Sequence, residues 1–171
     1  MNQLERMKRV FIVFLLIISQ AVLCQNKFSF TENGLAPSQI TTKVNGYTKT
    51  ELQELTLSWI RERLKYSTAK VDGEFIILTV VKGNFIEVKK SYYNVKYSAK
   101  ISFDKGRFTL EPMDVFTKLN SKYDMGWQPF DLKDGSAFFK RGKPIKKTKV
   151  YLKKIPELFN KLNADLLRFL K

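Results

Sequence analysis

The sequence contains no histidine, and its 171 residues include one cysteine, Cys24. Histidine is the commonest general base near neutral pH and a frequent zinc ligand. Its absence excludes Ser-His and Cys-His nucleophile pairs and most zinc sites. The glycines stand singly, so there is no glycine-rich phosphate loop, and no calcium loop of alternating acids is present. We therefore expect a protein that is not an enzyme and that uses no cofactor or metal.

Two short patterns still resemble catalytic ones. Residues Ser67–Lys70 read STAK, the S-x-x-K spacing of penicillin-recognising enzymes, but the S-D-N and K-T-G elements of those enzymes are missing. Asp131 and Asp134 are a conceivable acid-base pair. They stand in a polar segment, however, with no sign of the burial that shifts a carboxyl pKa. A small hydrolase with Ser-Lys or carboxylate chemistry therefore stays an alternative hypothesis only.

Long apolar runs are also missing. The run Val10–Ile18 has nine residues, whereas ~20 residues are needed to cross ~30 Å of hydrocarbon. Arg6, Lys8 and Arg9 precede it, and polar residues follow shortly after it. A positive flank and a short apolar core are typical of an export signal. We expect residues 1–24 to be a signal peptide of a periplasmic or secreted protein, whose mature chain has no transmembrane helix.

Two processing routes are open for this leader. Cleavage between Cys24 and Gln25 releases a soluble chain, since Val22 and Cys24 are acceptable at the two positions that the general peptidase reads. Lipoprotein processing would instead leave Cys24 first and anchored to lipid, but the bulky Leu23 before it disfavours this route. Without Cys24, no disulfide stabilises the remaining 147 residues, and a packed core must do so.

Acidic residues are scarce. The chain has 31 basic and 16 acidic residues, a net charge of +15, which becomes +13 without residues 1–24. The stretch 140–154 contains no acid and attracts anionic lipid or polyanions, unless it is simply a solvated face. It offers no run of aromatic residues for base stacking, so we expect no nucleic-acid partner. Its candidate anion-contacting residues are Lys140, Arg141, Lys143, Lys146, Lys147, Lys149, Lys153 and Lys154.

The first half of the mature sequence predicts a strand followed by a helix. After a polar lead-in at residues 25–39, Ile40–Val44 is a short strand, and the helix follows over residues 47–66. Thr48 and Glu51 have the spacing of a capping box, in which each side chain binds the other residue's backbone N–H. Trp59 lies on the apolar stripe of this helix, so we expect it in the core rather than in a ligand site.

The middle of the chain predicts antiparallel strands. Phe75–Val81 is an apolar strand, and Lys82-Gly83-Asn84 a tight turn that leads back into Phe85–Val88. Tyr93–Phe103 alternates apolar and polar residues, which is typical of a sheet covered on one face only. A hairpin loop at residues 104–106 then leads into Arg107–Glu111, and Pro112 ends the pairing or marks an edge.

The last third predicts a long connection and a closing helix. Residues 117–147 mix aromatics with Gly, Pro and Asp, and Trp127 and Phe130 are candidates for a binding lip there. The apolar positions after Ile155 recur at helical spacing, with Pro156 in the first turn. This helix either covers the open face of the sheet or lies on a membrane surface. We expect the first, and thus a single domain over residues 40–171.

The segment GYTKTELQELTLSWIRERL and the alternating YYNVKYSAKISF resemble a bacterial family of unknown function with a TATA-binding-protein-like fold. In that family a Lys/Thr-and-acid helix start leads to a tryptophan near the helix middle, here Trp59. The resemblance covers roughly Ile40 to Phe116 and the closing helix. It implies an α+β fold in strand-helix-four strands-helix order, a curved antiparallel sheet with helices packed on one face, in exported envelope proteins. It implies no activity.

DNA binding does not follow from this resemblance, because the DNA-binding saddle needs two repeats, a basic concave surface and aromatic wedges. One repeat behind an export signal supplies none of these. We therefore expect a non-enzymatic binding or interaction module of the bacterial envelope, whose partner is a protein, a lipid or a glycan. The alternative is an anionic-surface binder that uses the basic stretch 140–154.

Overall fold

The computed structural model describes residues 27–123 and 125–171. The predicted signal peptide and its cleavage point at Cys24 and Gln25 lie outside these residues. The elements of the described chain are β1 (Ser29–Thr31), β2 (Gly34–Ala36), β3 (Ile40–Lys43), α2 (Lys49–Arg63), β4 (Ser67–Asp72), β5 (Phe75–Val88), β6 (Ser91–Asp104), β7 (Arg107–Leu119), β8 (Gln128–Phe130), the 3-10 turn η1 (Ser136–Phe138), β9 (Phe139–Lys140), β10 (Lys143–Pro144) and α3 (Lys149–Phe169).

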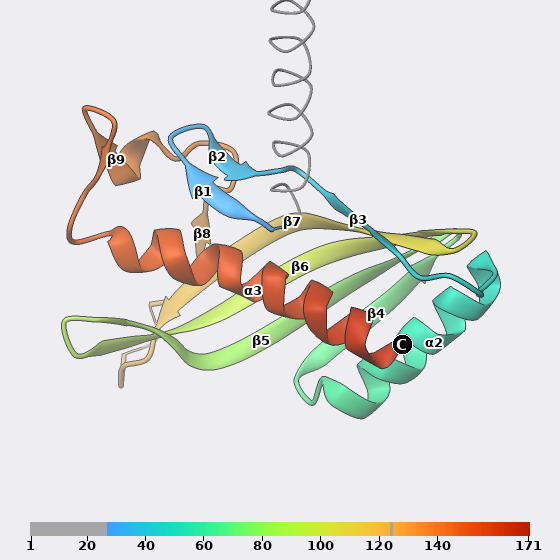
Figure 1. Cartoon of the computed structure of the whole chain (residues 1–171). Coiled ribbons are helices and arrows are strands. Elements are labelled where there is room, and N and C mark those ends of the chain that lie inside the picture. The colour runs from blue at the N-terminus through green and yellow to red at the C-terminus, as the bar shows by residue number, and fades with distance from the viewer. Residues whose placement is uncertain (1–26, 124) are drawn as a thin grey trace, which may run out of the picture.

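Strands β3 to β8 form a curved antiparallel sheet, and the described helices α2 and α3 cover one of its faces (Figure 1). The β1–β2 and β9–β10 hairpins are separate two-stranded sheets. The strand order is β3-β7-β6-β5-β4, and β8 pairs with β7 as a further edge. Helix α3 runs along the sheet, from the end that carries β9 to the end that carries α2 (Figure 1). The α+β class and the helices on one face are confirmed.

The alternation in β6 has the predicted consequence. Val95, Ala99 and Ile101 are fully buried toward the helices, whereas Lys96 and Lys100 point to the open face. Because successive side chains of a strand point to opposite faces, a period of two buries one complete row. The covered face of the sheet is therefore apolar, and the open face is polar.

The predicted capping box starts α2. The Thr48 Oγ1 accepts a hydrogen bond from the Glu51 N–H (3.3 Å), and a Glu51 carboxylate oxygen accepts one from the Thr48 N–H (2.7 Å). These bonds satisfy backbone donors that the first turn of a helix leaves free. Trp59 is 1% exposed, so its predicted place in the core is confirmed.

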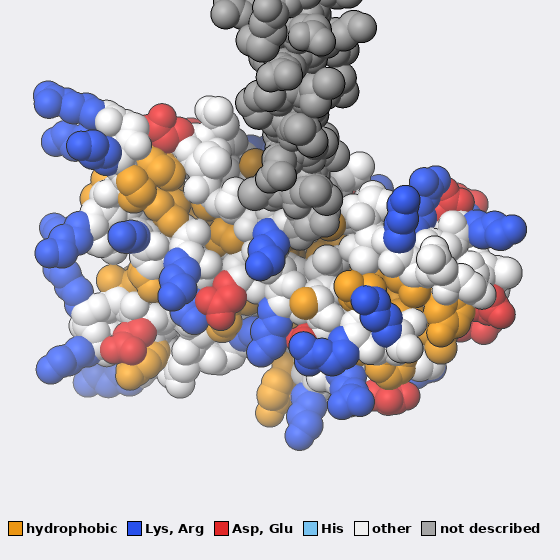
Figure 2. All heavy atoms as spheres, in the orientation of Figure 1, with side chains coloured by type: hydrophobic (Ala, Val, Ile, Leu, Met, Phe, Trp, Pro, Cys, Tyr) orange, Lys and Arg blue, Asp and Glu red, His pale blue; other side chains and the backbone are white. Residues whose placement is uncertain are grey.

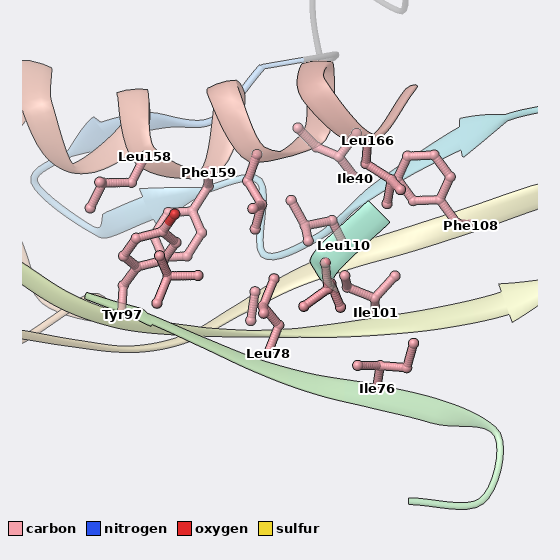
Figure 3. Close-up of a cluster of buried hydrophobic side chains, with 14 of the residues drawn as sticks. Ile40, Ile76, Leu78, Tyr97, Ile101, Phe108, Leu110, Leu158, Phe159 and Leu166 are labelled. Atoms are coloured by element: carbon pink, nitrogen blue, oxygen red, sulfur yellow. The ribbon is translucent and has the colours of Figure 1, made fainter. Parts of the chain in front are cut away.

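The core lies between α3 and the sheet (Figure 3). The rings of Tyr97 on β6 and Phe159 on α3 meet edge to face, with centroids 5.5 Å apart, the geometry that aromatic pairs prefer. Around them α3 buries its apolar stripe: Ile155, Leu158, Phe159, Leu162 and Leu166. Helix α3 thus covers the open sheet, as expected from its pattern.

The predicted turn at Lys82–Asn84 is wrong. Strand β5 continues to Val88, and only the register shifts between Lys82 and Ile86. Asn84 takes a positive φ of 51° there. The Asn84 N–H donates to the Asn94 Oδ1 (2.9 Å), and the Asn120 side-chain amide donates to the Asn84 Oδ1 (2.7 Å). Gly83 and Asn84 therefore belong to a β-bulge. A bulge, like a turn, can require a residue with positive φ, so the two have similar compositions.

Pro112 does not end its strand, because β7 runs on to Leu119. The pairing passes from Ser98–Asp114 to Ala99–Pro112, so Met113 is an extra residue in β7. A bulge is one of the few places where a sheet tolerates proline. The four longer strands between the helices, β4 to β7, match the predicted number, but the short strands β8, β9 and β10 follow them and were not predicted. The members of the four also differ, because the predicted pair over residues 75–88 is one strand, and β4 was missed.

Helix α3 begins at Lys149, so the prediction of Pro156 in its first turn is wrong. Pro156 is buried inside the helix and has no N–H to donate to the Leu152 carbonyl one turn earlier. Tyr151 and Ile155 extend the apolar stripe ahead of the proline and explain the earlier start. Part of the basic stretch is consequently helical.

Two segments expected as irregular contain strands. The lead-in at residues 25–39 includes the β1–β2 hairpin. The connection at residues 117–147 begins inside β7 and contains β8, η1, β9 and β10. The Leu35 N–H donates to the Leu132 carbonyl (2.7 Å), and the Gly135 N–H to the Glu32 carbonyl (3.0 Å). These bonds dock the two segments on each other.

Candidate functional site

The basic stretch 140–154 lies at one end of the domain, around β9, β10 and the start of α3 (Figures 1 and 2). Lys140 and Lys143 belong to the β9–β10 hairpin, Arg141 to its turn, Lys146 and Lys147 to the following connection, and Lys149, Lys153 and Lys154 to α3. All are exposed except Lys154, which is half-buried. The structure thus brings the predicted anion-contacting residues together.

The β9–β10 hairpin places like charges opposite each other. Its two-residue turn has positive φ at Arg141 (52°) and Gly142 (75°), as the favoured hairpin turns require. Lys140 therefore pairs in register with Lys143. Like charges directly across a ladder destabilise it. A residue outside the hairpin stabilises its turn: the Gly142 N–H donates to the Glu32 carboxylate (3.1 Å).

The basic side chains of this stretch are mostly unneutralised. Among the described residues, Lys154 is the one member of the eight in an ion pair, with Glu157 (3.2 Å). Elsewhere in the described chain, some basic residues have acidic partners: Lys49 pairs with Glu74, and Lys100 with Glu111 (3.4 Å). This end of the domain therefore carries a positive charge that ion pairs among the described residues compensate only at Lys154.

Two further lysines join this surface from a distant part of the sequence. Lys89 and Lys90 form the β5–β6 turn with positive φ (48° and 67°), and both are exposed. The turn lies at the same end as β9 and the start of α3 (Figure 1). We call Lys89, Lys90 and the basic residues of 140–154 the basic end. Sequence reasoning missed the two lysines, since only the β5–β6 hairpin brings them there.

Exposed apolar side chains lie in the loop that follows β7. Tyr123 is 67% exposed and Met125 is 64% exposed. Their loop starts at the β5–β6 turn, because the Asn120 N–H donates to the Tyr92 carbonyl (2.8 Å). The Lys122 ammonium lies 5.0 Å from the Tyr123 ring centroid. An aromatic side chain and a methionine among lysines suit the boundary between water and lipid.

Phe130, one half of the predicted binding lip, supports the basic end from inside. Its ring stacks on Phe138 (5.0 Å) and on Tyr151 (5.9 Å), and meets Phe30 edge to face (5.6 Å). This aromatic cluster joins the β1–β2 hairpin, β8, η1 and the start of α3. Position 135 requires glycine, because a Cβ there would overlap the Thr31 carbonyl oxygen and lie 2.9 Å from the Phe30 ring.

Trp127, the other half of the predicted lip, lies on the open face of the sheet. The Lys96 ammonium lies 5.1 Å from the Trp127 ring and 4.8 Å from the Phe116 ring. Phe130 pairs in register with the buried Val115 and so belongs to the covered face. Because the two residues serve opposite faces, the structure does not bring them together into one surface.

The candidate catalytic residues have structural contacts. Ser67 and Lys70 stand three residues apart on the edge strand β4, so their side chains point to opposite faces. The Ser67 hydroxyl instead donates to the Leu64 carbonyl (2.8 Å). Asp131 accepts from the Lys133 N–H (2.7 Å), and Asp134 from the Ser136 N–H (2.8 Å). The bonds from Ser136 lower the pKa of the Asp134 carboxyl. Both acids therefore stabilise their loop by accepting hydrogen bonds from its backbone.

In the described part of the chain, no group of three or more His, Cys, Asp or Glu residues is arranged to hold a metal ion. No helix within the same residues combines the length and the apolar character that a membrane crossing requires.

Comparison of the structure with known structures identifies its fold. A DUF4468 family protein from Bacteroides ovatus is similar with a TM-score of 0.64 and 14% identity, over 81% of this chain and 87% of that one. A TBP-like protein from Parabacteroides distasonis is similar with a TM-score of 0.59 and 15% identity, over 77% and 90% of the two chains. No known family profile and no curated protein sequence matches the chain. At these identities the similarity shows the fold alone, and the TATA-binding-protein-like fold that the sequence resemblance implied is confirmed.

Proposed function

We propose that this chain is an exported, non-enzymatic domain of the bacterial envelope that binds anionic lipid surfaces through its basic end. The observation that carries the proposal is the set of exposed cations in residues 140–149, which have no ion-pair partner among the described residues. A lysine or arginine near an anionic membrane contributes about 1 kcal/mol. Several such residues on one rigid surface therefore give a substantial affinity.

The apolar side chains at the same end support a lipid rather than a soluble polyanion. Tyr123 and Met125 would lose their exposed apolar area to the interfacial region of a bilayer while nearby lysines contact headgroups. A soluble polyanion would offer these two side chains no comparable environment.

The open face of the sheet is less suited to be the main binding surface. Lys96 already contacts two aromatic rings, and Lys100 contacts the Phe75 ring (4.9 Å) besides its ion pair with Glu111. The Ser98 hydroxyl likewise donates to the Asp114 carboxylate (3.1 Å). A ligand on this face would have to displace these contacts, whereas the basic end has few contacts to displace.

Co-sedimentation with lipid vesicles tests the proposal. The chain is expressed with its leader, and the processed protein is mixed with vesicles of phosphatidylcholine alone or with phosphatidylglycerol, at low and high salt. We expect binding to the anionic vesicles that weakens with salt, since the attraction is screened. The variant R141Q/K146Q/K147Q should lower the partition coefficient on the order of a hundredfold.

The matched control K65Q/K70Q/K105Q removes the same charge from exposed positions outside the basic end. It should retain most of the binding. Equal losses in the two variants would mean that net charge alone drives association. No binding to anionic vesicles at any salt concentration would contradict the proposal.

A further inference from the structure

A groove of about 430 Å³ lies between the end of α2 and the last turns of α3, away from the basic end. Arg63, Lys161 and Arg168 line it with positive charge. Both helices are amphipathic and bury their apolar stripes in the same core, so basic residues at the edges of these stripes line a common groove.

The charge of the groove is only partly balanced. Asp165 is its acidic lining residue, and its carboxylate lies 3.7 Å from the Arg168 guanidinium. Arg63 and Lys161 have no ion-pair partner within the described residues. Burial and the neighbouring Lys161 lower the pKa of Lys82, although Asp165 and Glu157 act against them. Lys82 on the neighbouring strand β5 is therefore part of the electrostatic environment of Lys161 and Asp165.

The rest of the groove is apolar. Leu64 and Phe169 are half-buried, and Trp59 closes the groove toward the core with 1% of its surface exposed. A ligand that fits this lining has an anionic group at one side and a ring or alkyl body at the other. Inorganic anions would leave the apolar part uncovered.

We propose that this groove binds a small organic anion. Arg63, Lys161 and Arg168 hold its carboxylate or phosphate, and the apolar body packs on Leu64 and Phe169. Guanidinium groups suit this role because their planar fork matches the oxygens of both anions.

The groove is independent of the proposed lipid surface. Arg168 lies 19 residues after Lys149 on α3, about 28 Å along the helix at 1.5 Å per residue. The vesicle experiment and the groove experiment therefore use different residues, and either can fail alone.

Tryptophan fluorescence tests the groove. In a Trp127→Phe background Trp59 is the remaining tryptophan of the chain, and it reports on the groove. The processed protein is titrated with phenyl phosphate, benzoate, inorganic phosphate and phenol. We expect saturable changes with phenyl phosphate or benzoate, and binding at least about tenfold weaker for inorganic phosphate and for phenol. The two organic anions distinguish a phosphate from a carboxylate ligand.

Two pairs of substitutions locate the site. R63Q/R168Q should weaken binding about tenfold or more, since each substitution removes a charged hydrogen-bond donor. R61Q/K65Q removes the same charge nearby, outside the groove lining, and should change affinity less than about twofold. The proposal is wrong if no organic anion binds saturably, if inorganic phosphate binds equally well, or if both pairs of substitutions weaken binding alike.

Discussion

The rings of Tyr93 and Tyr151 lie with their centroids 6.4 Å apart and their planes at 68°. This edge-to-face contact joins the β5–β6 hairpin to the start of α3, and so fixes Lys89 and Lys90 relative to the lysines of the helix. Burial and the neighbouring Tyr93 raise the pKa of Tyr151. Tyr151 therefore stays neutral at physiological pH, and the contact between the two rings is one of packing.

Removing this contact should loosen the basic end. We expect Tyr151→Ala to lower the free energy of unfolding by about 2 kcal/mol, because the ring is half-buried and packs on several others. Urea denaturation followed by circular dichroism measures the change. Tyr66→Ala is the control, since its side chain is 77% exposed, and it should change the stability by less than about 0.5 kcal/mol. Similar effects of the two substitutions would contradict a packing role.

A side chain at position 135 should separate the β1–β2 hairpin from the loop between β8 and η1, which contains Gly135. Gly135→Ala would force the new methyl group against the Thr31 carbonyl and the Phe30 ring, at a cost of about 2–3 kcal/mol. Thermal unfolding of the variant should show a lower Tm. At Gly83 a Cβ would meet only the Asn94 Oδ1 at 3.7 Å, so Gly83→Ala should leave the Tm nearly unchanged.

The capping box predicts a pH-dependent loss of stability. Thr48→Ala should cost about 1 kcal/mol at neutral pH. Hydrogen bonds from Thr48 lower the pKa of the Glu51 carboxyl, so its contribution is present above the unfolded-state pKa and is lost as pH falls through the folded-state pKa. The Thr48 N–H, the larger cause of the shift, remains in T48A, and only the bond from the Thr48 hydroxyl is lost. Urea midpoints of wild type and T48A should therefore partly converge in acid. Thr50→Ala, at a neighbouring exposed position, should show no such convergence.

Tyr123 and Met125 should contribute to vesicle binding without changing its salt dependence. Y123S/M125S removes exposed apolar area, and at about 25 cal/mol per Å² we expect a loss of roughly tenfold in partitioning. Co-sedimentation over a range of salt concentrations measures it. Met113→Ser, on β7 and 40% exposed, is the control and should bind like wild type. A change in the salt slope of Y123S/M125S would contradict a purely apolar role.

Local patterns predicted much of the fold, and contacts distant in sequence explain what they missed. The alternation of β6 and the Thr48–Glu51 box need only neighbouring residues, so they could be recognised. Gly83-Asn84 has the composition of a turn, and only Asn94 and Asn120 make it a bulge. The candidate anion-contacting residues were found as a run of charge, whereas Lys89 and Lys90 needed the β5–β6 hairpin. No sequence pattern pointed to the groove between α2 and α3.

The proline inside α3 divides the helix into two parts that differ in their stability against local unfolding. Before Pro156 lie the turns that carry Lys149, Lys153 and Lys154; after it lie the turns buried in the main core. The Leu152 carbonyl has no amide partner one turn later, so the first part can open without disturbing the second. Amide hydrogen exchange should therefore be faster before the proline than after it. The lysine-bearing turns of α3 therefore depend on the packing of Tyr151 against Phe130 and Phe138 for their position, whereas the turns after the proline are held by the core.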